Sequence, residues 1–247
     1  MGVSVAFANS HFLPFISENT SFIMQKVLTF TLALLACTLY NIIYAQTIEL
    51  KSDGRDSSYV ASITSRSEKN ISSLELSEPT KTNVRNLVIN RYFELNDIYA
   101  ERDTLINQAK RNLTGDEKNR AIDAARSACD SKLYRSHFAF PANLGIYLSH
   151  EQIIAIFDAM TYNKVKVTYD AYCDMIPSLT DEEKAQMYAW LCEARDLAID
   201  AESSNKKHEV FNKYKGRINN YLSARGYDIT QERKAWEERV KARGGTL

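Results

Sequence analysis

The sequence predicts an all-α fold, an irregular bundle of about seven helices that forms a single domain. The composition is the first reason: 247 residues include only 8 glycines and 4 prolines, and charged residues make up 25%. Such a composition is typical of packed helices rather than of strands and turns. The second reason is that apolar residues recur every three or four positions, the period of an amphipathic helix. We expect the helical domain over residues 57–247, a length that suits one hydrophobic core.

Residues 24–45 have the features of a secretory signal peptide. Lys26 provides a positive charge, an apolar run without acids or bases follows from Val27 to Leu39, and Ala45 is a small residue at the expected cleavage position. The run is shorter than the roughly 20 residues that cross a bilayer. We therefore expect an exported protein, periplasmic or secreted, with no transmembrane span after processing.

Two details of this region have alternatives. Residues 1–23 hold no basic residue, and we interpret them as a non-native upstream extension before the natural initiator Met24. Cys37 ends a Leu-Leu-Ala-Cys sequence that is similar to a lipobox, so a lipid anchor at Cys37 is the minor alternative to cleavage at Ala45. An uncleaved membrane anchor is the other alternative to cleavage at Ala45.

Helices are expected in order along the rest of the chain. Residues 46–56 are polar and expected to be flexible, and a first helix is predicted from Val60 to Leu74. A long second helix keeps one apolar stripe from Val84 to Ala109. Arg91 and Arg102 fall on that stripe, and we expect both at its edge, with packed stems and heads in water.

Three later helices are predicted to begin with a capping box, S/T-x-x-E/Q. In this motif the hydroxyl accepts the backbone N–H three residues on, and the acid or amide accepts the N–H of the capping residue. The three motifs are Thr114–Glu117, Ser149–Gln152 and Thr180–Glu183. Helical spacing continues in three more segments, which are Tyr169–Ile176, Phe211–Leu222 and Asp228–Val240.

Charge and cysteine content exclude several classes of function. The 31 basic and 31 acidic residues balance, which argues against nucleic acid as a partner because phosphate binding needs a basic excess. Three cysteines remain after processing, Cys129, Cys173 and Cys192. Cys173 and Cys192 could meet if their helices packed antiparallel, but we favour three small, buried apolar side chains. Without a CxxC pair or a His/Cys cluster, the sequence predicts no metal site and no cofactor.

Charge is distributed unevenly near the C-terminus. Residues 203–227 hold six bases and one acid, whereas residues 180–202 hold seven acids and two bases. One interpretation is that two oppositely charged helices attract each other along a shared edge. The other is a carbohydrate site in which cations and amides contact hydroxyls or carboxylates and tyrosines stack on a sugar ring. Its candidate ligand-binding residues are Lys207, His208, Lys215, Arg217 and Tyr221.

The acidic segment suggests a catalytic alternative. Glu193, Asp196 and Asp200 share one helical face, and His208 follows shortly after. Paired carboxylates cleave glycosides, so these four are candidate catalytic residues of a glycan-active enzyme. Solvated acids on an exposed helix face are the ordinary alternative. We do not favour an enzyme, because the chain has no serine-nucleophile elbow, P-loop or HExxH motif.

Four segments of the chain resemble the domain of unknown function 3826 family: DAMTY (158–162), TYDAYCDMIPSLT (168–180), EARDLAID (193–200) and KHEVFNKYKGRINNYLSARGYD (207–228). The similarity runs from about Tyr59 through Trp236, and KYKGRINNYL (213–222) is its most specific part. The resemblance implies a secreted helical protein of a polysaccharide-degrading bacterium, with sugar as its ligand. It carries over no catalytic residues.

Together these observations predict an exported accessory protein that binds an oligosaccharide or polysaccharide, either a plant-cell-wall glycan or an acidic one. A glycan-active enzyme that uses the carboxylates of 193–200 with His208 is one alternative. A helical periplasmic scaffold or chaperone-like protein is the second.

Overall fold

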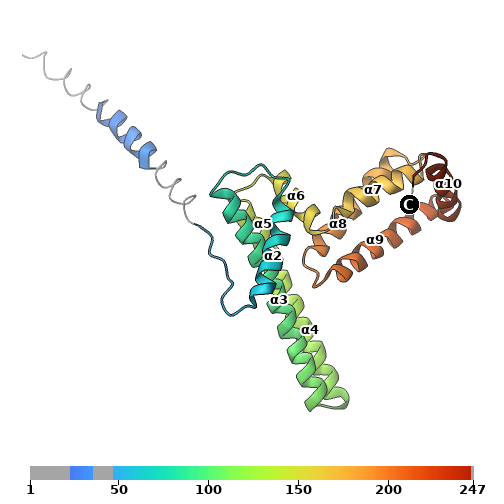
Figure 1. Cartoon of the computed structure of the whole chain (residues 1–247), viewed down its shortest axis with the longest axis horizontal. Helices are drawn as coiled ribbons and strands as arrows, with labels where there is room; N and C mark the ends of the chain where they lie inside the picture. Colours follow the sequence, from blue (N-terminus) through green and yellow to red (C-terminus); the bar gives the residue numbers. More distant parts are fainter. Residues whose placement is uncertain (1–22, 36–46, 246–247) are drawn as a thin grey trace, which may run out of the picture. The chain divides into compact units, whose positions relative to one another are not determined.

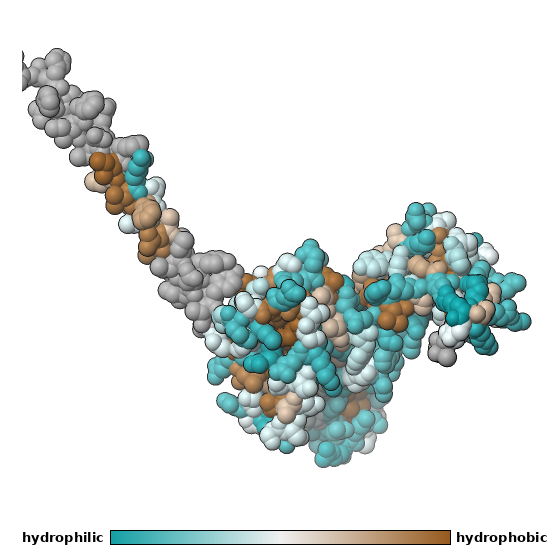
Figure 2. All heavy atoms as spheres, turned by 45° about the horizontal axis from the view of Figure 1, so that its top comes forward, coloured by the Kyte–Doolittle hydropathy of each residue, from teal (hydrophilic) through white to brown (hydrophobic). Residues whose placement is uncertain are grey.

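The computed structural model describes residues 23–35 and 47–245. The chain divides into two units, residues 1–47 and 48–247, which we describe separately. In the first unit residues 23–35 form a helix with exposed apolar side chains, drawn in brown in Figure 2. The positions Cys37 and Ala45 lie outside the described residues, so the signal peptide stays a prediction. No helix in the described ranges combines the length and the hydropathy needed to cross a membrane.

The second unit is all-α, as predicted, with no strand in its described part. Nine helices follow one another in these residues (Figure 1). They are α2 (Ser57–Ile71), α3 (Thr80–Asn112), α4 (Gly115–His137), α5 (Ala139–Leu144), α6 (His150–Met160), α7 (Lys164–Met175), α8 (Asp181–Ala198), α9 (Ser204–Ala224) and α10 (Ile229–Ala242). We expected about seven, and α5 shows why the number differs: six residues are too few to give a periodic pattern.

The long helix α3 organises the first half of this unit. It lies beside α4 as an antiparallel hairpin in Figure 1 and also packs against α2 and α5. The predicted apolar stripe is the reason, because Val84 and Val88 are fully buried and contact the hydrophobic core that includes Leu144 and Ile156. The end of α6 packs into the same core through Met160.

Helices α7 to α10 form a second hydrophobic core. The predicted stripe of α9 provides Phe211, Ile218 and Leu222, and the facing stripe of α8 provides Met187 and Leu191. All five side chains are at most 1% exposed. The two helices also carry opposite charge and pack together, and Arg217 on α9 lies 3.3 Å from Glu193 on α8, as one interpretation of the sequence predicted.

Two of the three predicted capping boxes are confirmed. Both bonds of the motif are present at Ser149 and at Thr180. The prediction for Thr114 is wrong, since this side chain makes no capping hydrogen bond. Gly115 follows it with a φ of 56°, and this left-handed step gives the first turn of α4 a geometry in which the hydroxyl does not reach the N–H of Glu117.

Residues 48–51 lie within the segment 46–56 that we expect to be flexible, and side-chain amides of α3 bind their backbone. The Ile48 N–H donates to Asn83 Oδ1 at 2.7 Å, and Asn86 Nδ2 donates to the Ile48 carbonyl at 2.8 Å. One turn further along α3, Asn90 accepts from the Lys51 N–H and donates to the Glu49 carbonyl. Side-chain amides thus provide hydrogen-bond partners for this stretch of backbone, which has no partner strand.

The prediction that Arg91 lies at the edge of the stripe with its head in water is wrong. Its side chain is 1% exposed, not at the solvent edge. Its guanidinium lies 2.7 Å from Glu94 and 2.6 Å from Asp200, and it donates to Ser136 at 2.9 Å. The sequence could not reveal this position, because Asp200 is 109 residues away.

The three cysteines of the second unit are free. Cys129 on α4 is buried, whereas Cys173 on α7 and Cys192 on α8 are partly exposed. The prediction of buried side chains therefore holds for Cys129 alone.

Candidate functional site

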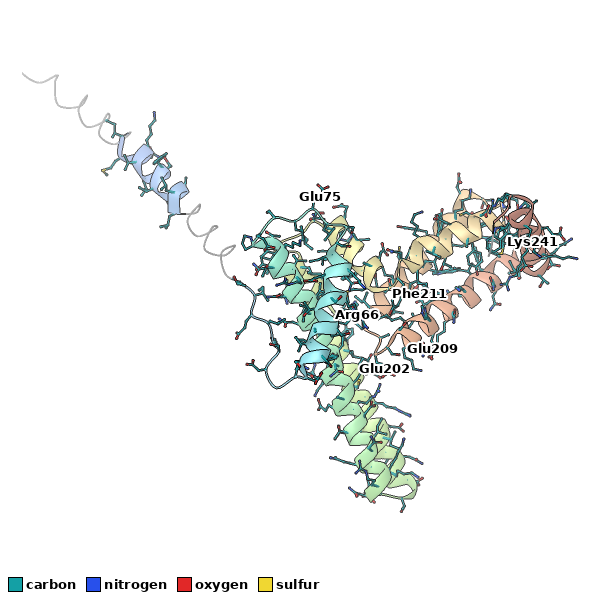
Figure 3. The ribbon with its side chains drawn as sticks, viewed as in Figure 1. Arg66, Glu75, Glu202, Glu209, Phe211 and Lys241 are labelled. Atoms are coloured by element: carbon teal, nitrogen blue, oxygen red, sulfur yellow. The ribbon has the colours of Figure 1, made fainter. Side chains whose placement is uncertain are left out.

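A cavity of about 580 Å³ lies between α2, α3, the end of α6 and the start of α9. Figure 3 marks two residues of its lining, Arg66 on α2 and Glu202 just before α9. Tyrosines and polar side chains make up most of this lining. They are Tyr59, Tyr92, Tyr99, Tyr162, Arg66, Lys69, Asn70, Asn96, Asn163, Glu202, Ser203, Ser204 and Lys207.

Lys207 is the central polar group of this cavity. It precedes Phe211 by one turn on the buried stripe of α9, so the helix turns its side chain inward and leaves the residue only 6% exposed. The ammonium donates to the Met160 carbonyl at 2.9 Å and lies 5.7 Å from the centroid of the Tyr92 ring. The Tyr92 hydroxyl accepts a hydrogen bond from Asn70 at 2.9 Å.

The charge of Lys207 is not balanced by a nearby acid. Within the described part of the chain, no carboxylate oxygen lies within 4.0 Å of this ammonium. Burial is the main cause that lowers the pKa of Lys207 to about 8; the neighbouring cation Arg66 acts in the same direction, and Asp200 opposes the shift. The amine therefore carries most of its charge at neutral pH, at a cost to the folded state.

The turn between α6 and α7 forms one wall of the cavity. Tyr162 and Asn163 adopt left-handed backbone angles, with φ of 61° and 54°. The Asn163 N–H donates to the Asp158 carbonyl at 2.7 Å and the Tyr162 N–H to the Ala159 carbonyl at 3.2 Å, the pattern of a Schellman motif, whose left-handed position is usually glycine. Here it holds a tyrosine that is 47% exposed.

His208 supports this tyrosine. The two rings lie with centroids 5.4 Å apart and planes inclined by 32°. The structure therefore brings two of the five predicted ligand-binding residues to the cavity: Lys207 lines it, and His208 contacts its wall. The family segments DAMTY and KHEV meet at this point, although 45 residues separate Tyr162 from Lys207.

The other three predicted ligand-binding residues lie elsewhere. Arg217 stacks over Trp190 at 4.4 Å, and the Tyr221 ring meets Trp190 edge-on at 5.1 Å, which makes a separate cluster between α8 and α9. Lys215 is half-buried, and burial lowers its pKa, with Lys164 and Arg233 acting in the same direction. None of the three is in the cavity lining.

The structure does not bring the four candidate catalytic residues together. Glu193 lies 3.3 Å from Arg217, and Asp196 lies 3.0 Å from Arg195. Asp200 binds Arg91 and His137, each at 2.6 Å. His208 faces Tyr162 instead of any of these acids. Each carboxylate is thus engaged by a different cation, and none of the three lines the cavity.

Several residues of the cavity were not identified from the sequence. Arg66, Asn70 and Tyr92 lie on α2 and α3, far along the chain from the basic segment. The position of Asn70 could have indicated a buried polar residue, because it adjoins Ile71, the apolar residue that ends the stripe of α2. Outside the cavity, His137 Nδ1 contacts Asp200, which is 63 residues away along the chain. Among the residues described, no group of three or more His, Cys, Asp or Glu is placed to hold a metal ion.

Comparison with known families agrees with the resemblance seen in the sequence. The family model described as protein of unknown function (DUF3826) matches residues 60–242, and the chain belongs to this family. A search of the curated proteins found no match. The match covers every residue of the cavity lining except Tyr59.

Proposed function

We propose that this member of the family is an exported accessory protein that binds a carbohydrate in the cavity around Lys207 and Tyr162. One observation carries the proposal: an exposed tyrosine ring, side-chain amides and a buried ammonium converge on one cavity. A pyranose ring has an apolar face that packs on an aromatic ring, and its hydroxyls need donors and acceptors at the edge. The volume of about 580 Å³ falls within the usual range for small-ligand sites, about 300–1,000 Å³.

Export is the second part of the proposal, and residues 24–45 support it. Their charged start, apolar run and small residue at the end are those of a signal peptide. An exported binding protein meets polymers and oligosaccharides of the surroundings, which agrees with the ligand class suggested for the cavity.

Binding fits the geometry better than catalysis does. A glycosidase places two carboxyl groups about 5–10 Å apart on either side of the scissile bond. Among the described residues, Glu202 is the single carboxylate of the cavity lining, and Arg102 holds it at 2.6 Å. Within this described lining there is no second acid to act with it.

Calorimetric titration of the purified protein with a panel of plant-cell-wall oligosaccharides tests the proposal. We expect saturable binding of at least one member, which Tyr162→Ala weakens at least tenfold. Tyr188→Ala is the matched control, because Tyr188 is 49% exposed against 47% for Tyr162 and does not line the cavity. Absence of binding across the panel, or equal losses in both variants, would overturn the proposal.

A further inference from the structure

The cavity around Lys207 gathers positive charge from several sources. Besides the buried ammonium, the exposed cations Arg66 and Lys69 lie in its lining. Two helices also begin there: α7 follows Asn163, and α9 follows Ser203. The N-terminus of a helix carries a partial positive charge and N–H groups that face outward.

The two nearest acids already have cationic partners of their own. Glu202 is held by Arg102 at 2.6 Å. Asp200, which acts on Lys207 from outside the lining, contacts both Arg91 and His137 at 2.6 Å. The excess charge of the cavity is therefore positive, and its most deeply buried member has a carbonyl oxygen, not a carboxylate, as its partner.

We infer that the ligand of this cavity is an acidic sugar, a uronic acid residue within an oligosaccharide, whose carboxylate binds the ammonium of Lys207. This inference rests on the proposed function and specifies its ligand class. The sugar ring then packs on Tyr162, which lies at the rim of the same cavity. A buried ammonium without an acid is costly, and a carboxylate brought by the ligand removes that cost through a charge-assisted hydrogen bond.

The pairing links binding to the protonation of Lys207. Its pKa of about 8 in the free protein means that about nine-tenths of the molecules are protonated at a pH one unit lower and about one-tenth at a pH one unit higher. A carboxylate binds the protonated form. The association constant for an acidic oligosaccharide should therefore fall about tenfold across these two pH units, while that for a neutral oligosaccharide stays level.

The test compares α-1,4-linked galacturonate oligomers with the carboxyl-reduced oligomers of the same length and linkage, and with a sulfated oligomer. We expect the uronate oligomer to bind at least tenfold more tightly than its carboxyl-reduced counterpart. Its association constant should fall at alkaline pH, as described above. Lys207→Met should remove the preference and Lys207→Arg should retain it. The control Lys206→Met changes an adjacent exposed lysine outside this cavity lining and should bind as the unmodified protein does.

The outcomes separate the two levels of the proposal. Equal binding of the uronate and the reduced oligomer overturns the acidic-sugar inference and leaves carbohydrate binding standing. Tighter binding of the sulfated oligomer overturns the assignment of a carboxylate. An undiminished uronate preference in a folded Lys207→Met protein, checked by its helical circular dichroism, overturns the role of Lys207. Binding of none of the three overturns the inference and, if the wider panel also fails, the proposed function with it.

Discussion

Replacing Lys207 with methionine tests the electrostatic description of the cavity through stability alone, without any ligand. Methionine keeps a long unbranched side chain and removes the charge. Burial, assisted by Arg66, lowers the pKa of the lysine from 10.5 to about 8 in the folded protein. Each unit of pKa difference between the folded and unfolded states corresponds to 1.36 kcal/mol, so the burial of this charge costs the folded state about 3 kcal/mol at neutral pH.

The direction of the pH dependence follows from where the proton resides. Between pH 8 and 10.5 the unfolded chain keeps the Lys207 proton and the folded chain releases it. The unfolded state then binds more protons, and the free energy of unfolding rises with pH. Relative to that of Lys207→Met, the free energy of unfolding of the unmodified protein should rise by about 3 kcal/mol across this window and should not rise below it.

Urea unfolding, followed by circular dichroism at a series of pH values, measures this difference. Tyrosine ionisation also changes stability at high pH, but both proteins contain the same tyrosines and their contributions cancel in the subtraction. Lys206→Met serves as control, because its exposed lysine has a raised pKa through Glu209 and should give no rise in the same window. The difference in free energy of unfolding between Lys207→Met and the unmodified protein should change across the pH window. A change of less than about 1 kcal/mol would refute the burial of an unpaired charge.

Three further predictions concern stability, each measured by urea unfolding. Gly216→Ala should stabilise the protein by about 0.5–1 kcal/mol, because Gly216 is an exposed residue inside α9 and nothing lies within 4 Å of an added Cβ; a loss would mean hidden crowding. Thr180→Ala should cost about 1 kcal/mol and Thr114→Ala less than about half of that, since the first residue alone makes a capping bond; equal losses would contradict this. Arg91→Leu should cost about 3–5 kcal/mol by leaving the Asp200 carboxylate partly buried without its guanidinium; a cost below about 1 kcal/mol would show that the pair contributes little.

The fold was predictable where the signal is local. The stripe of α3 repeats from Val84 to Ala109, and the caps at Ser149 and Thr180 need only four residues each, so neither depends on distant parts of the chain. Thr114 fits the same motif but fails, because Gly115 takes a left-handed angle that the motif does not encode. A capping box describes side-chain types and assumes the backbone between them.

The site was predictable only in part, because its partners come from different helices. The sequence identified Lys207 as a basic residue in a charged segment, and its place one turn before Phe211 on the stripe was also visible. What it could not supply was Tyr92, which reaches the ammonium from α3, or the carbonyl of Met160 at the end of α6. Conversely, Arg217 looked similar to Lys207 in sequence but stacks on Trp190 outside the cavity.

Two features that destabilise the folded protein meet at this cavity. An apolar residue at position 207 would continue the stripe of α9, yet a lysine occupies it at a cost of about 3 kcal/mol. A glycine at position 162 would fit the left-handed turn, yet Tyr162 and Asn163 adopt angles that cost about 1–3 kcal/mol each. Neither residue improves the core, and both line the same cavity. Since destabilising choices that converge on one cavity are characteristic of binding sites, the carbohydrate assignment should be tested at Lys207 and Tyr162 before the exposed cluster around Trp190.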